Sequence, residues 1–229
     1  MPAVDLSVVT YRPEPELLAS LLTSLAEASP SLTLNLFVED NSPDAAQADA
    51  IRAMPEVAVA PFAKTDVNRS GGNLGFGRGH NANAKRGSAP WLLVINQDCI
   101  VEPGALERLV AIAERDDPKV AAWEMRQVPY EHPKAYDPAS LDSPWVSGAA
   151  TLFRRSAYEA VGGFDDAIFM YGEDVDLSWR LRAAGWRLTY QPRCAVLHLT
   201  YRQAAEVKPL QVFGGVRTNL CLRMRYGGP

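Results

Sequence analysis

Short apolar runs of strand length alternate with segments of helical periodicity, and this alternation constrains the fold more than any other feature of the chain. The first run, residues 5–11, is followed by leucines on one face of a predicted helix, namely Leu17, Leu18, Leu21, Leu22 and Leu25. Further strands are predicted at 32–38, 57–60, 91–95, 120–125 and 146–153, and helices at about 44–54, 103–115 and 173–184. This order is typical of an α/β fold, in which helices cover a mostly parallel sheet.

Length and composition narrow the classes of protein that this chain can be. Its 229 residues are enough for one large domain whose core needs neither disulfides nor a structural metal. A net charge of -4 argues against a general nucleic-acid binder, which carries a basic excess. Cys99, Cys194 and Cys221 show no CxxC spacing, so we expect free thiols in a reducing cytoplasm. No basic leader and no apolar run of membrane-spanning length is found, so we expect neither secretion nor a transmembrane helix.

One predicted strand ends abruptly in Asn96, Gln97 and Asp98. In open α/β sheets, ligands bind at the carboxyl ends of the strands. Hard divalent cations prefer oxygen ligands and leave positions open for phosphate oxygens, so Asp98 is a candidate metal ligand. A helix-capping role is the simpler explanation, but Asp98 lies several residues before the helix predicted to start near residue 103.

A second acidic group stands at the predicted start of a helix, where Glu173, Asp174 and Asp176 occupy three of four positions. Acidic residues are favoured at a helix N-terminus, so a solvated helix start is one explanation. The preceding residues 164–172 are rich in bulky aromatic side chains and glycine, which favours a position that lines a cleft. We therefore predict that a carboxylate of this group acts as a general base.

Two further features carry weaker signals. Residues 77–82 match the GxGxxA pattern of dinucleotide-binding folds, but no strand is predicted directly before the glycines, as that fold requires. We therefore do not expect a nicotinamide site, although such a loop can approach a nucleotide in another way. His198 ends an apolar strand, where a single histidine is more often a hydrogen-bonded core residue than a ligand.

The chain changes character after residue 200, and we expect a body at 1–200 and a basic amphipathic tail at 201–229. In the tail, five basic residues stand against Glu206 alone: Arg202, Lys208, Arg217, Arg223 and Arg225. Apolar residues lie between them, which predicts a helix. Such a helix can lie on an anionic membrane surface, or pack on its own domain with a solvated basic face.

Seven blocks, taken in order along the chain, carry a family resemblance. They are Val8-Val9-Thr10-Tyr11, Glu39-Asp40-Asn41-Ser42, Asn73-Leu74-Gly75-Phe76-Gly77 with Asn81, Asn96-Gln97-Asp98, Gly148-Ala149 with Arg154-Arg155, Gly162-Gly163-Phe164-Asp165, and Gly172-Glu173-Asp174-Val175-Asp176-Leu177 with Arg180. Over about residues 4–200 the chain resembles the inverting family-two glycosyltransferases, above all the bacterial rhamnosyltransferase-like subgroup. The resemblance implies a single nucleotide-sugar-binding domain of the glycosyltransferase A type, with a Rossmann-like mixed sheet flanked by helices.

The same resemblance implies that a nucleoside-diphosphate sugar binds at the carboxyl ends of the first strands, with Mg²⁺ or Mn²⁺ on the diphosphate. Thr10, Tyr11 and Asp40 would hold a pyrimidine base. The other donor-binding residues that it implies are Asn73, Gly75, Asn81, Asn96 and Gly148. Asp98 matches the metal-binding position of the family's DxD motif, whose first position here is Asn96, and His198 is implied as a further ligand.

The chemistry follows from the resemblance as well. Asp174 matches the catalytic base, which takes a proton from the acceptor hydroxyl in a single inverting displacement, and Glu173 would orient the acceptor or Asp174. The QxxRW motif of processive relatives is missing, so one sugar is added at a time. We expect a dTDP- or UDP-sugar donor, such as one carrying rhamnose, and a cell-surface glycan or lipid-linked acceptor. The expected location is the cytoplasm, with a peripheral place on the inner face of the cell membrane.

Two other classes of protein stay open at this point. A non-catalytic nucleotide-sugar or glycan-binding module would keep the fold but lose Asp98 or Asp174, and this chain retains both. A sugar nucleotidyltransferase would usually place a glycine-rich, Lys- or Arg-bearing loop directly after its first strand, whereas residues 10–14 contain no glycine. The sequence therefore favours an inverting, metal-dependent, non-processive glycosyltransferase.

Overall fold

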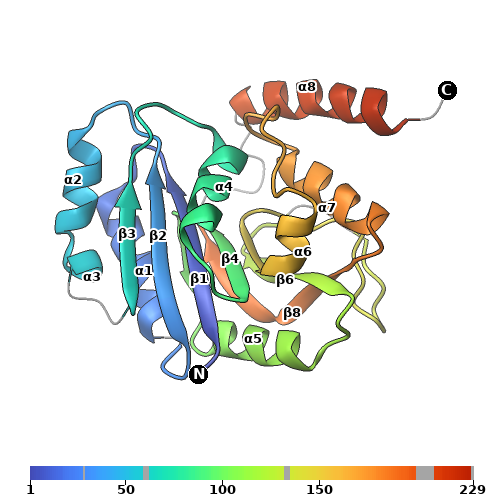
Figure 1. The fold of residues 1–229 in the computed structure, drawn as a ribbon, viewed down its shortest axis with the longest axis horizontal. Coiled ribbons are helices and arrows are strands. Elements are labelled where there is room, and N and C mark those ends of the chain that lie inside the picture. The colour runs from blue at the N-terminus through green and yellow to red at the C-terminus, as the bar shows by residue number, and fades with distance from the viewer. Residues whose placement is uncertain (28, 59–61, 132–134, 200–208, 228–229) are drawn as a thin grey trace.

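The computed structural model describes residues 1–27, 29–58, 62–131, 135–199 and 209–227. Within these residues, one mixed sheet of eight strands has the order β3-β2-β1-β4-β7-β6-β8-β5 (Figure 1). The strands are β1 (Ala3–Thr10), β2 (Thr33–Asp40), β3 (Lys64–Asn68), β4 (Trp91–Asn96), β5 (Cys99–Val101), β6 (Val120–Val128), β7 (Ala150–Arg154) and β8 (Arg187–His198). The α/β class and the mixed, Rossmann-like sheet are thus confirmed.

The first half of the sheet is parallel and sets the position of the polar strand ends. β1 lies between β2 and β4 and runs parallel to both, so Thr10 is level with Asp40, and Val9 is level with Asn96. The carboxyl ends of parallel strands meet at one edge of a sheet. In the second half, β7 runs antiparallel to both β4 and β6, whereas β8 is parallel to β6. The polar residues that end β1, β2 and β4 are therefore neighbours in space.

Helices cover both faces of the sheet (Figure 1). They are α1 (Pro15–Glu27), α2 (Ala46–Ala53), α3 (Pro55–Ala58), α4 (Phe76–Arg86), α5 (Ala105–Arg115), α6 (Arg155–Ala160), α7 (Glu173–Ala183) and α8 (Pro209–Tyr226). α1 and α5 contribute Leu18, Leu21 and Leu109 to the larger apolar core. α6 and α7 contribute Tyr158 and Leu177 to a second core on the other face.

The strand expected at 57–60 is wrong, and residues 59 and 60 of it lie outside the described residues. Residues Pro55–Ala58 form α3, because a proline is well suited to the first turn of a helix. The third parallel strand is β3, which follows at Lys64–Asn68 and, among the strands that the structure describes, pairs with β2 alone. β3 is a partly exposed, polar edge strand, and such strands lack the apolar run by which buried strands are found.

Several other bounds differ from those expected. The strand predicted at 146–153 begins only at Ala150, and the one predicted at 120–125 extends to Val128. β5 and α6 were not predicted. Of the long strand β8, only the last part was predicted. β8 contains Pro192, and its register against β6 shifts between Met125 and Arg126. An irregular strand of this kind breaks the apolar pattern that a continuous strand would show.

The glycines of the GxGxxA pattern lie inside α4 and serve helix packing. A Cβ atom on Gly77 would lie 2.7 Å from the Cβ of Phe164, and one on Gly79 would lie 2.7 Å from a methyl group of Val9. The lack of side chains therefore lets α4 approach the sheet closely. Helix packing thus explains both glycines of the pattern.

The last helix, α8, crosses the molecule beyond α7 and lies at the same end as the carboxyl edge of the sheet (Figure 1). Arg202, Glu206 and Lys208 of the basic tail, and the boundary expected at residue 200, lie outside the described residues. Among the helices that the structure describes, none combines the length and the apolar character needed to cross a bilayer.

Candidate active site

A cavity of about 730 Å³ opens at the carboxyl edge of the sheet. It is lined by all but two of the residues predicted for the site, namely Thr10, Tyr11, Asn73, Gly75, Asn96, Asp98, Gly148, Glu173, Asp174 and His198. These residues come from distant parts of the chain and are brought together by the parallel strands and by the start of α7. The two predicted residues outside this lining are Asp40 and Asn81.

Asp40 is fully buried beside the cavity and is held by the ends of β1 and β2. Its Oδ1 atom accepts hydrogen bonds from Thr10 Oγ1 at 2.9 Å and from Ser42 Oγ at 2.6 Å. Its Oδ2 atom is buried without a hydrogen-bond partner among the described residues. A buried carboxylate oxygen without a donor is costly, and Asp40 lies directly beside the cavity-lining residues Thr10 and Asn41.

The loop before α4 is fixed by asparagine side chains. Asn73 Oδ1 accepts a hydrogen bond from the Gly75 amide at 2.9 Å, and Asn41 Nδ2 donates to the Gly75 carbonyl at 3.0 Å. Gly75 has φ of 81°, and a Cβ atom there would lie 2.2 Å from the carbonyl oxygen of Phe169. Only glycine meets both requirements. The loop therefore presents its backbone to the cavity in a defined conformation.

Asp98 and His198 form a pair that fits a divalent cation. His198 Nε2 lies 3.4 Å from Asp98 Oδ1 and 3.2 Å from Asn96 Nδ2. Cys99 is close to both, but its thiol is fully buried, and burial together with the charge of Asp98 raises its pKa, so it stays protonated. A carboxylate oxygen and an imidazole nitrogen on one side of an open cavity are suitable ligands for Mg²⁺ or Mn²⁺ and leave room for phosphate oxygens.

Gln127 determines which nitrogen of His198 faces the cavity. Gln127 Nε2 donates to Glu124 Oε1 at 3.4 Å, and its Oε1 lies 2.8 Å from His198 Nδ1. An amide oxygen only accepts hydrogen bonds, so Nδ1 of the neutral ring carries the hydrogen. The lone pair is then on Nε2, next to Asp98, as a metal ligand requires.

The two carboxylates at the start of α7 differ in environment. Glu173 is buried, and its burial and the charge of Asp174 raise its pKa to about 8. Asp174 is half-buried, and its Oδ2 accepts a hydrogen bond from the Gly148 amide at 3.1 Å. Its Oδ1 accepts from the Val175 amide at 2.8 Å. Near neutral pH the pair therefore holds a proton on Glu173, and Asp174 is the carboxylate that can accept another.

Asn81 does not belong to this cavity. Its Oδ1 accepts hydrogen bonds from Tyr158 Oη at 2.6 Å and from the Phe164 amide at 2.9 Å, and its Nδ2 donates to the Phe164 carbonyl at 2.8 Å. It lines a second cavity of about 500 Å³ together with α6 and the turn at 161–166. The observed role of Asn81 is therefore to fasten that turn to α4.

Several other lining residues were not predicted, including Gln127, Tyr130, Glu131, Leu210 and Val212. Gln127 is the last residue but one of β6, and the rule that ligands gather at carboxyl ends would have found it had the strand not been expected to end at residue 125. Leu210 and Val212 belong to the first turn of α8, and nothing in the sequence indicates that this turn reaches the cavity.

A carboxylate just after β4 (Asp98) and one at the start of α7 (Asp174) lie at the carboxyl edge of a mixed sheet, which is the arrangement of a glycosyltransferase of the A type. Residues 7–171 match the family described as glycosyl transferase family 2, and residues 139–211 match one described as glycosyltransferase-like family 2. The chain therefore belongs to glycosyltransferase family 2, which confirms the resemblance carried by the seven blocks.

Relatives of known sequence place the chain within the family. It is 30% identical to the N-acetylglucosaminyl-diphospho-decaprenol L-rhamnosyltransferase of Mycobacterium tuberculosis, over 83% of this chain and 74% of that protein. It is 44% identical to the rhamnosyltransferase WbbL of Escherichia coli, over 25% of this chain and 22% of that protein. The chain is thus a rhamnosyltransferase-like glycosyltransferase, in agreement with the subgroup predicted.

Solved structures show the same fold at low identity. The mannosyltransferase PcManGT of Pyrobaculum calidifontis, in complex with GDP-Man and Mn²⁺, superposes with a TM-score of 0.75 at 16% identity, over 99% of this chain and 65% of that one. TarS of S. aureus gives a TM-score of 0.64 at 17% identity, over 100% of this chain and 41% of that one. The chain therefore spans less than two thirds of each of these solved chains.

Proposed function

We propose that this glycosyltransferase moves one sugar, rhamnose or a similar hexose, from a nucleoside-diphosphate donor to a hydroxyl of a lipid-linked or cell-surface glycan. The transfer is inverting, non-processive and dependent on a divalent metal. The observation that carries the proposal is that the pair Asp98 and His198 and the carboxylate of Asp174 line one cavity at the carboxyl edge of the sheet. A site for the diphosphate and a base for the acceptor are thus within reach of one substrate.

The donor base is a pyrimidine, held by Thr10, Tyr11 and Asp40. The buried Oδ2 of Asp40, which has no donor among the described residues, supports this assignment because uracil and thymine carry an N–H group. Tyr11 is 45% exposed at the cavity, where its ring offers a stacking surface. Asn73, Gly75, Asn96 and Gly148 complete the donor site, and Asn81 supports it indirectly through the turn at 161–166.

The diphosphate lies against Asp98 and His198. A divalent metal such as Mg²⁺ or Mn²⁺, held there, would supply positive charge to stabilise the negative charge on the departing nucleoside diphosphate. Asp98 and His198 would hold the ion, and Gln127 keeps the lone pair of His198 on Nε2. Asn96 supplies an amide where many relatives place a carboxylate, so this site carries less negative charge toward the phosphates.

Asp174 is the base in this proposal. The acceptor hydroxyl oxygen forms a bond to the anomeric carbon, the bond from that carbon to the diphosphate oxygen breaks, and the hydroxyl proton passes to Asp174. The Gly148 and Val175 amides orient the Asp174 carboxylate for this transfer. Glu173, whose pKa is raised to about 8, is neutral near pH 7 and leaves the negative charge to Asp174.

Residues 1–200 form the catalytic domain and residues 201–229 a tail that serves it. The acceptor class follows from the Mycobacterium tuberculosis relative, whose name specifies a decaprenol-linked substrate. A cytoplasmic enzyme at the inner face of the cell membrane would meet both a nucleotide-sugar donor and a lipid-linked acceptor of this kind. No nucleic acid is involved.

A screen of dTDP-, UDP- and GDP-sugars tests the proposal. We expect metal-dependent release of nucleoside diphosphate from a dTDP- or UDP-sugar, and its loss when the metal is removed with a chelator. Nuclear magnetic resonance of the product should show inversion at the anomeric carbon. Turnover of GDP-sugars alone would overturn the pyrimidine assignment, and full activity in a chelator would overturn the metal requirement.

A further inference from the structure

We propose that the outer face of α8, defined as Phe213, Val216, Leu220 and Met224, is a docking surface for an anionic membrane leaflet. This proposal deepens the proposed function, because it places the cavity at the surface where a lipid-linked acceptor resides. The docking itself is inferred from the structure of α8 alone, and it can be tested without any substrate.

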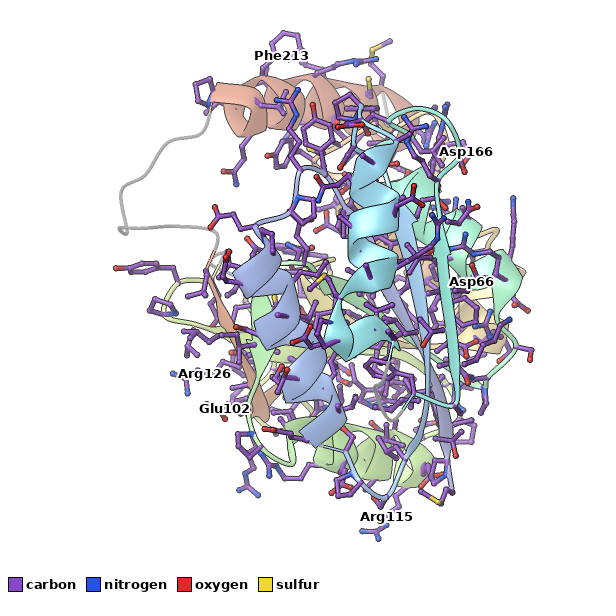
Figure 2. The ribbon with its side chains drawn as sticks, turned by 90° about the vertical axis from the view of Figure 1, so that its left-hand side faces the viewer. Asp66, Glu102, Arg115, Arg126, Asp166 and Phe213 are labelled. Atoms are coloured by element: carbon purple, nitrogen blue, oxygen red, sulfur yellow. The ribbon has the colours of Figure 1, made fainter. Side chains whose placement is uncertain are left out.

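The outer face is an exposed apolar row on a regular helix. Its four side chains recur at helical spacing, so they lie along one side of α8. Phe213 is 69% exposed, Val216 59%, Leu220 58% and Met224 87%. Phe213 lies on the side of α8 that faces away from the rest of the molecule (Figure 2). A row of large apolar side chains in water is unfavourable and indicates a surface that is covered in use.

The opposite side of α8 is attached to the catalytic domain. Thr218 and Leu222 are buried there, and a Cβ atom on Gly172, the residue before α7, would lie 2.6 Å from Thr218 Cγ2. Near the end of the helix, the Tyr226 hydroxyl donates to Asp176 Oδ1 at 2.7 Å. These contacts fix the rotation of α8, so the apolar row cannot turn inward without losing them.

Arg225 strengthens the attachment. It donates to Asp176 Oδ1 at 2.9 Å and forms an ion pair with Asp165. Asp176 is completely buried and also accepts from Arg180 Nε at 2.7 Å. The positive charge of Arg225 is therefore neutralised by carboxylates of the protein itself.

The charge that remains on α8 favours an anionic partner. By helical spacing, Arg217 and Arg223 flank the apolar row on its two sides. The residues from Pro209 to Tyr226 include no aspartate or glutamate. Apolar side chains between arginines on an otherwise unopposed basic helix are typical of helices that lie in the interface of an anionic bilayer. A second copy of α8 fits less well, because it would bring arginines against arginines.

The outer face is continuous with the active site. Leu210 and Val212, in the first turn of α8, line the cavity, and they are 57% and 53% exposed. A leaflet in contact with α8 would therefore lie beside the mouth of the cavity. The diphosphate end of a lipid-linked acceptor would reach the cavity while its hydrocarbon chain stays in the bilayer.

Co-sedimentation of the full chain with vesicles tests the surface. We expect binding to vesicles that contain phosphatidylglycerol, weaker binding to pure phosphatidylcholine, and a decrease with added salt. The double variant Arg217→Gln/Arg223→Gln should lose about thirtyfold in partitioning, which corresponds to about 1 kcal/mol per arginine. Phe213→Ser/Leu220→Ser should also weaken binding, whereas the matched charge variant Arg115→Gln/Lys119→Gln, which alters exposed residues on and just after α5, should bind like the wild type.

Equal pelleting of all variants would overturn the proposal. So would a dimer that forms without vesicles and is disrupted by Phe213→Ser/Leu220→Ser, because it would assign the face to a second copy. Vesicle binding and sugar transfer are measured separately, so failure of this proposal can be distinguished from failure of the proposed function. Variants of the outer face should keep wild-type transfer to a water-soluble acceptor, and vesicle binding should persist even if no sugar donor is turned over.

Discussion

Glu173 and Asp174 are neighbours in the chain but hold protons differently because the first turn of α7 places them differently. Glu173 is buried, with one carboxylate oxygen that has no partner among the described residues. Asp174 is half-buried and receives two backbone N–H groups. The sequence predicts the carboxylates at a helix start, but the assignment of neutral and charged forms depends on burial, which only the packed structure reveals.

Glu173→Gln tests the raised pKa through stability. The native state keeps a proton on Glu173 up to a pKa of about 8, whereas the unfolded chain releases it near the ordinary value of 4.5. Between these two pH values the free energy of unfolding of the wild type should therefore fall by about 1.4 kcal/mol per pH unit relative to that of the variant. Urea unfolding at several pH values measures the difference. Parallel pH profiles of the two proteins would contradict the raised pKa.

Gln127→Leu tests the orientation of His198. Without the acceptor at Nδ1 the ring is free to choose its tautomer, so we expect Mn²⁺ affinity to fall by about 10- to 100-fold, as is usual when such a supporting partner is lost. Titration of Mn²⁺ followed by electron paramagnetic resonance measures this affinity directly. Asp98→Ala should abolish most of the binding. Unchanged affinity in Gln127→Leu would show that His198 does not depend on this contact.

Among the elements, the regular buried strands and the amphipathic helices could be predicted, whereas the edge strands and the irregular strand β8 could not. β1, β2 and β4 are apolar runs because both faces are covered, and α1 shows its leucines at helical spacing. β3 is a half-exposed edge strand with the sequence KTDVN, which no apolar pattern reveals. For α8 the sequence predicts an amphipathic helix, but the direction of its apolar face is set by contacts with α7 that are distant in the chain.

Gly172→Ala tests the contact between α7 and α8. Gly172 has φ of 93°, and the added methyl group would meet Thr218 Cγ2 at 2.6 Å, so we expect a loss of about 1–3 kcal/mol in the free energy of unfolding. Thr218→Ala removes that methyl group, and the double variant should recover the steric part of the loss but not the backbone strain. A double-mutant cycle from denaturant unfolding measures the coupling. If the changes in the free energy of unfolding were purely additive, the residue before α7 and Thr218 of α8 would not be in steric contact.

On the scale of the whole molecule, the sheet gathers at one edge residues that are distant in the sequence. Asp98 could be predicted as a site residue because it follows a strand whose carboxyl end must lie at that edge, whereas Thr10 and the choice of Asp174 came from the family resemblance. Asn81 was expected at the same site but lines a second cavity, where it contacts Phe164. The sequence does not show which way a side chain in the middle of α4 points. Leu210 and Val212 could not be predicted, since they depend on how α8 docks.

Asp174→Asn, assayed for both transfer and nucleotide binding, tests the central claim most directly. The amide keeps the shape of the carboxylate but cannot accept the acceptor proton, so we expect transfer to fall by about a hundredfold or more. Calorimetry should find unchanged affinity for the nucleoside diphosphate with Mn²⁺, and Asp49→Asn, at an exposed position on α2, should match the wild type in both assays. Transfer by Asp174→Asn at the wild-type rate would contradict the account and place the base elsewhere.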